Sequence, residues 1–208
     1  MLDFLVRLLL RVFIRIEGRE EMEKVPLQGP ALVVMNHINF LEAPLFYNLY
    51  KPRPMWAMAK TELWSNPFFG VFVRRWGAIA VKRGGSNRET FALVKKLLDK
   101  GHLVALAPEG TRSRRGTLQR GKPGIAILAH ETGVPVIPVA HWGGQNFWRN
   151  ARHLKPTTIH LRVGTPFIPE AALGKTARQD VADQVMLHIA HLMPPELQGY
   201  YSQKIMGN

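Results

Sequence analysis

A histidine and a glutamate shortly after an apolar run are the first candidates for chemistry in this sequence. His37 follows the run ALVVM (residues 31–35) and one asparagine, and Glu42 lies five residues further along. On a continuous helix five residues turn through about 500°, so the two side chains would lie roughly 140° apart. An irregular turn could instead fold the histidine back onto the carboxylate. A carboxylate bonded to one imidazole nitrogen fixes the tautomer and leaves the other nitrogen free to take a proton, so the pair is a candidate acid–base dyad for a hydroxyl substrate.

A helix cap is the alternative interpretation of Glu42. Asn39 could be the N-cap residue, with the Glu42 side chain three residues later reaching back to it. That arrangement would make Pro44 the fifth helical residue, where its missing N–H costs a hydrogen bond. Proline favours the first helical turn, which moves the expected helix start to residues 41–43. The segment from 37 to 41 is then irregular, and both interpretations of Glu42 stay open.

A second group of polar residues follows the apolar run LVALA (103–107), where the chain continues PEGTRSRRG. A solvent-facing basic loop is one interpretation, but it does not explain a carboxylate directly after a buried strand. A glycine permits a tight turn with exposed backbone N–H groups, hydroxyls add donors, and an arginine can hold a phosphate through two hydrogen bonds. The candidate phosphate-site residues in this stretch are Glu109, Gly110, Thr111, Arg112 and Ser113.

Short strand patterns alternate with helical patterns through the chain. Expected strands are 31–35, 55–59, 78–81, 103–107, 136–140 and 159–163, and expected helices are 43–50, 64–73, 87–100, 122–132 and 177–192. Gly101 and Gly133 are expected to end two of these helices. The alternation predicts a single α/β domain with a central mixed or largely parallel sheet flanked by helices. Ligands of such sheets gather at the carboxyl ends of the strands, where the polar residues above lie.

Residues 1–16 predict an amphipathic helix on a membrane surface, followed by one globular domain over residues 17–208. Asp3, Arg7, Arg11 and Arg15 recur every four residues with apolar triplets between them, which makes one slanting polar stripe on a helix. No apolar run approaches the roughly 20 residues of a transmembrane helix, and no secretory signal is recognisable. Basic residues on one side and Leu or Phe on the other are typical of helices in the membrane plane. A helix packed on the domain is the alternative.

The composition favours an anionic partner. The net charge is +13, and residues 74–122 hold 13 Lys and Arg against three acids, so this stretch carries +10 and the rest of the chain +3. A solvated basic face is the alternative to a phosphate-bearing ligand or membrane. The absence of cysteine excludes disulfides, thiolate metal sites and cysteine nucleophiles. No RNA-recognition or zinc-finger pattern is present, so nucleic acid is not the expected partner.

Four segments in this order resemble the motifs of the glycerolipid acyltransferase family, and of the lysophosphatidic acid acyltransferases within it. The family's blocks read here as NHINFLE (36–42), GAIAVKR (77–83), PEGTRS (108–113) and VPVIP (134–138), and AKTELWSNPFFG (59–70) also matches a stretch between the first two. The resemblance covers about residues 16–168. PEGTRS with an upstream histidine block is specific, whereas the other two blocks alone are not.

The resemblance implies a role for each matching residue. His37 is implied as the general base that deprotonates an acceptor hydroxyl, which attacks an acyl thioester directly, and Glu42 as the carboxylate that orients it. The acceptor-phosphate region is implied at Glu109–Ser113 together with Arg83, with Lys60 and Lys122 as neighbouring cations. No cofactor or metal is expected. The implied substrates are lysophosphatidic acid, acylated at its sn-2 hydroxyl to phosphatidic acid, and a thioester of coenzyme A or acyl carrier protein.

This chain departs from the family pattern at three positions. Glu42 replaces the usual Asp of the dyad, Lys82 stands where an acid usually precedes the arginine, and Ala107 replaces an aromatic residue. We therefore keep three alternatives: acylation of another lysolipid, acylation of glycerol 3-phosphate, and a non-catalytic protein that binds anionic lipid or nucleic acid. The expected location is the cytoplasmic face of the cell membrane, with peripheral or monotopic attachment.

Overall fold

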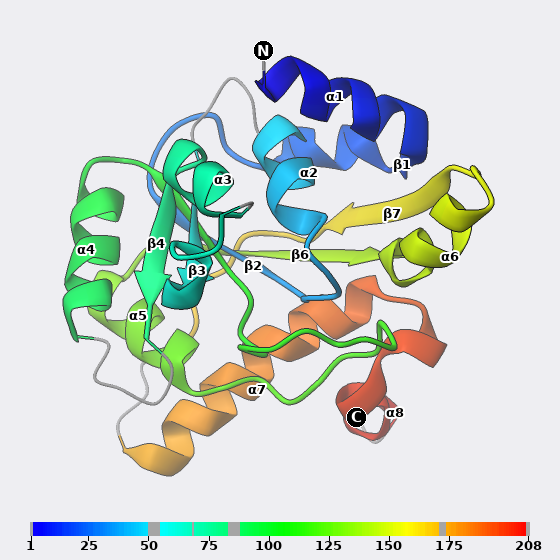
Figure 1. The fold of residues 1–208 in the computed structure, drawn as a ribbon. Coiled ribbons are helices and arrows are strands. Elements are labelled where there is room, and N and C mark those ends of the chain that lie inside the picture. The colour runs from blue at the N-terminus through cyan, green and yellow to red at the C-terminus, as the bar shows by residue number, and fades with distance from the viewer. Residues whose placement is uncertain (1, 50–54, 68, 83–87, 171–173, 207–208) are drawn as a thin grey trace.

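The computed structural model describes residues 2–49, 55–67, 69–82, 88–170 and 174–206, and Figure 1 shows their arrangement around a central sheet. The sheet has the strand order β1-β7-β6-β2-β5-β3-β4. The strands are β1 Ile14–Glu17, β2 Ala31–Met35, β3 Met55–Lys60, β4 Ala78–Val81, β5 Leu103–Leu106, β6 Val136–Trp142 and β7 Thr157–Val163. Neighbouring strands are parallel except β6 and β7, which are antiparallel. The predicted α/β fold with a largely parallel, mixed sheet is confirmed.

Helices cover both faces of this sheet. They are α1 Leu2–Phe13, α2 Glu42–Leu49, α3 Phe69–Arg75, α4 Arg88–Asp99, α5 Gly124–Thr132, α6 Phe147–Arg152, α7 Lys175–Leu192 and α8 Ser202–Met206. In Figure 1, α4, α5 and α7 lie on one side of the sheet and α1 and α2 on the other. None of the helices in the described ranges is long and apolar enough to cross a membrane.

The central strand β2 shows why this sequence buries both faces of its sheet. Leu32 and Val34 belong to the hydrophobic cluster beneath α4, α5 and α7. Ala31, Val33 and Met35 belong to the cluster on the opposite face, together with Phe46 of α2. An uninterrupted apolar run is typical of a parallel strand that is buried on both sides. The polar residues that follow such a strand therefore emerge at the edge of a rigid core.

The predicted helix boundaries need three corrections. The N-terminal helix ends at Phe13, because residues 14–17 (IRIE) alternate buried and exposed side chains and pair with β7 as an edge strand. The predicted helix 64–73 is instead a 3-10 turn at Thr61–Leu63 followed by α3, and the Asn66 side chain accepts the Phe69 N–H at the start of that helix. The short helices α6 and α8 were not predicted.

The predicted helix ends at two glycines are confirmed. Gly101 and Gly133 follow α4 and α5 with φ values of 80° and 61°, in the left-handed region that glycine adopts without strain. The Gly133 N–H donates to the Ala129 carbonyl and closes the last turn of α5. The strands β2, β3 and β5 are paired in parallel, so their carboxyl ends share one edge of the sheet.

Candidate active site

The turn between β2 and α2 brings His37 and Glu42 into contact. Glu42 is the first residue of α2, and its Oε2 accepts a hydrogen bond from the His37 Nδ1–H. Its Oε1 accepts the main-chain N–H groups of Ile38 at 2.5 Å and Asn39 at 2.8 Å. One carboxylate oxygen therefore holds the turn, as the helix-cap interpretation predicts, and the other holds the histidine. The structure thus shows one contact of each kind, although α2 begins at Glu42 rather than after an Asn39 cap, and the catalytic role of the pair stays a prediction.

The surroundings of Glu42 keep it ionised. Burial raises the pKa of this carboxyl, but the hydrogen bond from His37, the nearby His141 and the Asn39 N–H outweigh burial and bring the pKa below its ordinary value. An ionised Glu42 requires the Nδ1–H form of His37. That tautomer leaves Nε2 as the ring nitrogen that can take a proton, and about 29% of the His37 side chain is exposed.

The PEGTRS segment holds the main chain of His37 on both sides. Glu109 Oε1 accepts the His37 N–H at 2.9 Å, and the Ser113 N–H donates to the His37 carbonyl at 2.7 Å. The second oxygen of Glu109 accepts the Gln119 N–H at 3.0 Å. Glu109 is only 1% exposed, and burial raises its pKa to about 7 against the opposing effect of these two hydrogen bonds. The structure thus gives Glu109 and Ser113 contacts with the main chain of His37, and their contact with a substrate stays a prediction.

Two supporting residues, Asn36 and His141, were not predicted as part of the site. The Asn36 side chain donates to the His141 carbonyl at 2.8 Å and accepts the His141 N–H at 2.9 Å, which ties the end of β2 to β6. The His141 Nε2–H donates to the Asn36 carbonyl at 2.8 Å and lies 3.7 Å from Glu42 Oε1. Burial lowers the pKa of His141, and the nearby Glu42 carboxylate opposes this shift. Asn36 directly precedes the base and His141 ends a predicted strand, and these positions were the available signals.

The Asn36–His37 peptide is consequently held at both of its polar atoms. His141 donates to its carbonyl oxygen and Glu109 accepts from its N–H. Both partners are buried, where hydrogen bonds are poorly replaced by water. The histidine therefore projects from a main chain that has few alternative positions.

The other residues predicted for the phosphate site lie near this turn and differ in how exposed they are. Gly110 has a φ of +64° and an exposed surface, and a Cβ at this position would lie 2.9 Å from the Lys122 Nζ, so the Lys122 side chain passes over it. The Lys122 N–H donates to the Pro108 carbonyl, which anchors its main chain to the same loop. Arg112 is exposed, and Thr111 is half-buried. These groups are placed where they could meet a phosphate, and that contact stays a prediction.

Lys60 and Arg83 are the remaining residues predicted for the phosphate site. Lys60 ends β3 and is half-buried at the same edge of the sheet. Arg83 lies outside the described residues. Within the described ranges, no three His, Asp or Glu side chains gather in an arrangement that could hold a metal ion.

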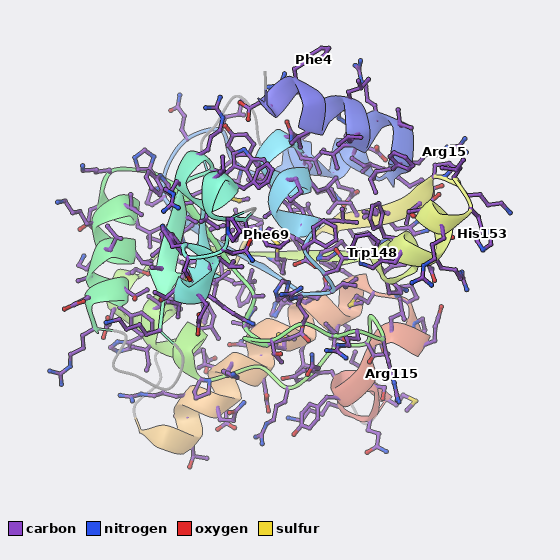
Figure 2. The ribbon with its side chains drawn as sticks, viewed as in Figure 1. Phe4, Arg15, Phe69, Arg115, Trp148 and His153 are labelled. Carbon is purple, nitrogen blue, oxygen red and sulfur yellow. The ribbon has the colours of Figure 1, made fainter. Side chains whose placement is uncertain are left out.

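An aromatic cluster borders the turn of residues 36–42, which we call the catalytic turn because it holds the candidate dyad. Phe40, inside the turn, contacts Phe69 of α3 and both Phe147 and Trp148 of α6, with ring centroids 6.2, 5.9 and 5.5 Å away, respectively. Figure 2 shows Phe69 and Trp148 projecting from these two helices on the side facing the viewer. The site thus combines a histidine–carboxylate pair, a basic loop and an apolar rim.

Comparison with known proteins identifies the family to which this arrangement belongs. The acyltransferase family model matches residues 14–142, which include both motifs of the site. The chain therefore belongs to the acyltransferase family. The predicted resemblance is confirmed.

Several relatives are named 1-acyl-sn-glycerol-3-phosphate acyltransferase. The protein from Pseudomonas aeruginosa is 31% identical over 147 residues, covering 69% of this chain and 56% of the relative. The protein from Borreliella burgdorferi is 30% identical over 171 residues, covering 79% of this chain and 68% of the relative. This chain spans about half the length of the first of these relatives.

A solved structure shares the fold. The crystal structure of the 1-acyl-sn-glycerophosphate (LPA) acyltransferase PlsC from Thermotoga maritima matches 88% of this chain and 73% of its own, with a TM-score of 0.64 and 26% sequence identity.

Proposed function

We propose that this chain transfers a fatty acyl group from an acyl thioester to the sn-2 hydroxyl of lysophosphatidic acid and so forms phosphatidic acid. The observation that carries the proposal is the pairing of His37 Nδ1 with the ionised Glu42. This pairing prepares Nε2 to accept a proton from an alcohol. The names of the relatives from Pseudomonas aeruginosa and Borreliella burgdorferi support the acceptor.

The reaction proceeds by general base catalysis. His37 Nε2 takes the proton of the acceptor hydroxyl as the hydroxyl oxygen attacks the thioester carbonyl carbon. The tetrahedral intermediate collapses, the carbon–sulfur bond breaks, and the imidazolium returns the proton to the leaving thiolate. Glu42 stabilises the imidazolium while it exists, because the carboxylate accepts its Nδ1–H. Products are an ester and a thiol, and no covalent acyl-enzyme is needed.

The acceptor phosphate lies against the loop that follows β5. Arg112 offers two parallel N–H donors and Lys122 adds a positive charge. Gly110 has no side chain, which leaves room for the Lys122 side chain to pass over it. Glu109 does not face the phosphate in this proposal, because its two oxygens already accept main-chain N–H groups. Its role is to hold the histidine at the correct distance from a phosphate bound to the same loop.

The N-terminal helix places the enzyme on an anionic membrane surface, on the cytoplasmic side. Phe4, Leu8 and Val12 of α1 are exposed at spacings of four residues and form one apolar stripe. Leu10 points the other way, into the cluster that contains Leu41 of the catalytic turn. Apolar insertion and attraction between basic residues and anionic lipid add together in such an attachment.

Thioester consumption that depends on the acceptor tests the proposed function. Thiol release from acyl-CoA, and separately from acyl carrier protein thioester, is measured with lysophosphatidic acid, glycerol 3-phosphate or lysophosphatidylcholine as acceptor. The proposal predicts that lysophosphatidic acid gives the highest kcat/KM. Preference for one of the other acceptors would reassign the substrate, and thiol release without any acceptor would contradict acyl transfer.

A further inference from the structure

The segment that contains α6 combines exposed apolar side chains with a run of positive charge. Residues 147–156 read FWRNARHLKP and carry three Lys and Arg side chains and no acid. We call them the α6 segment. Trp148 is 62% exposed and Leu154 is 84% exposed. Arg149, Arg152 and Lys155 are exposed beside them. Large apolar groups among cations are typical of surfaces that enter the interface of an anionic membrane.

Leu154 is held outward by an unfavourable backbone conformation. Its φ is +52°, and it is the one non-glycine residue with a positive φ in the described part of the chain. Glycine is the usual residue at this position after a helix, since a side chain raises the energy of the left-handed conformation. The turn is nevertheless well formed, because the N–H groups of Leu154 and Lys155 donate to the Ala151 and Asn150 carbonyls. Leucine is unfavourable here in two respects, because its backbone conformation is strained and its apolar side chain is exposed to water. An apolar contact for this side chain must come from outside the domain.

The α6 segment lies beside the end of α1. In the pairing of β1 with β7, Ile14 is opposite Thr157, so the residue after α1 and the residue after the α6 segment are neighbours. Phe147 and Leu10 also pack against one hydrophobic cluster. Figure 2 shows Arg15 and His153 at the same edge of the molecule. The end of α1 and the α6 segment therefore lie side by side at one corner of the domain.

This corner also adjoins the catalytic turn. Trp148 packs on Phe40, which lies between His37 and Glu42 in the sequence, with ring centroids 5.5 Å apart. A surface that binds Trp148 would thus lie close to the turn that carries His37. A lipid acceptor that diffuses in a bilayer could enter the site without crossing water.

We propose that the α6 segment is a second membrane-binding element, with an anionic lipid bilayer as its partner. The inference rests on the membrane placement proposed for α1 and extends it to a two-point attachment. Leu154 and part of Trp148 enter the interfacial region, while Arg149, Arg152 and Lys155 contact lipid phosphates. The two attachments orient the domain so that the catalytic turn faces the lipid.

Leu154→Gly is the decisive variant, because glycine relieves the positive φ while it removes the apolar side chain. Co-sedimentation with phosphatidylcholine vesicles that contain phosphatidylglycerol measures partitioning, and thermal unfolding measures stability. We expect partitioning about tenfold weaker, as for removal of one largely inserted leucine, and an unfolding temperature equal to or above that of the wild type. The matched control is Leu27→Gly, which removes a leucine that is 76% exposed. Leu27 precedes β2, at the amino ends of the parallel strands, whereas the α6 segment follows the carboxyl end of β6. The control should leave partitioning unchanged.

A second variant tests the charges. Arg149→Gln with Arg152→Gln should weaken partitioning roughly 5- to 30-fold on phosphatidylglycerol-containing vesicles, and far less on phosphatidylcholine alone. Wild-type partitioning in both Leu154→Gly and the double glutamine variant overturns the inference. Partitioning that is unchanged while Leu154→Gly turns a dimer into a monomer in sedimentation also overturns it, since the segment would then contact a second copy of the chain.

Failure of this inference is distinguishable from failure of the proposed function. Acyl transfer is measured on lysophosphatidic acid dispersed in neutral detergent, where no bilayer is present. Leu154→Gly should keep the wild-type rate there and lose rate only on vesicle-borne acceptor. Equal losses in both media would assign Leu154 to the reaction itself and contradict a membrane role.

Discussion

Replacing Glu42 by glutamine separates the two contacts that this side chain makes. In the native turn one oxygen accepts the N–H groups of Ile38 and Asn39, and the other accepts the His37 Nδ1–H. The amide of Glu42→Gln can satisfy the turn only if its carbonyl oxygen faces Ile38 and Asn39, because its NH₂ group would oppose two donors there. The NH₂ group must then face His37. It can donate to Nδ1 but cannot accept from it, so His37 changes to the Nε2–H tautomer and loses its ability to take a proton at that atom.

The size of the effect follows from these contacts. Loss of a positioned general base costs about 10²–10⁴-fold in rate, and the same acid-to-amide change beside the histidine of a serine protease costs about 10⁴-fold. We therefore expect kcat of Glu42→Gln to fall about 10²–10⁴-fold with little change in acceptor KM. The two turn hydrogen bonds change from charged to neutral acceptors, so stability should fall by about 1–3 kcal/mol. At about 2–4 °C per kcal/mol, the protein stays folded at the assay temperature.

Steady-state kinetics with acyl-CoA and lysophosphatidic acid, together with thermal unfolding, measure both quantities. Glu42→Asp is the companion variant, since its shorter side chain cannot hold His37 and the turn at once if the glutamate is matched to this geometry, and its activity should drop. A stable Glu42→Gln enzyme with wild-type kcat would refute the dyad and leave only the helix cap.

Three further predictions concern the residues around the dyad. Arg112→Ala should lower kcat/KM for lysophosphatidic acid roughly 10- to 100-fold, as expected for one charge-assisted contact of about 1.5–3 kcal/mol, with partial rescue by Arg112→Lys; unchanged acceptor kinetics would place the phosphate elsewhere. Burial raises the pKa of Glu109 from 4.5 to about 7, so the folded state binds this proton more tightly than the unfolded state does. The free energy of unfolding should therefore fall by about 3 kcal/mol as the pH rises from 4.5 to about 7. Urea unfolding across the window should show a smaller decrease in Glu109→Gln, and an equal decrease would contradict the assignment. His141→Phe, which removes the donor to the carbonyl before the base, should lower kcat up to about tenfold without changing KM, and His141→Gln should restore most of it, whereas the buried control Val139→Ala in the same strand should affect stability alone.

The sequence predicted the elements of this fold where hydrophobic period and helix ends agree. The uninterrupted run at 31–35 and the glycines at 101 and 133 were sufficient to place β2 and the ends of α4 and α5. The edge strand β1 was missed because IRIE continues the arginine spacing of α1, and four residues match a helix and a strand pattern equally well. Its pairing with β7, some 140 residues later in the chain, decided the outcome.

The sequence predicted that His37 and Glu42 lie together, but it did not predict the hydrogen bonds around them. The spacing allowed an irregular turn that brings His37 and Glu42 together. It could not show that one Glu42 oxygen accepts from His37 while the other accepts from the main chain of the turn. The sequence predicts Glu109 in the phosphate region, and it could not show that the two oxygens of Glu109 accept the main-chain N–H groups of His37 and Gln119. The contribution of His141 depends on the parallel pairing of β2 with β6, which brings residues 105 positions apart into contact and leaves no local pattern in the sequence.

The central claim is that His37 takes the proton of an acceptor hydroxyl during direct acyl transfer. Its most direct test is the amount of thiol and of phosphatidic acid formed from acyl-CoA and lysophosphatidic acid by the wild type and by His37→Ala, with acceptor binding measured in parallel. We predict equal amounts of the two products, no thiol without acceptor, and a rate about 10²–10⁴-fold lower in His37→Ala with acceptor binding retained. A His37→Ala protein that forms phosphatidic acid at the wild-type rate would contradict the account.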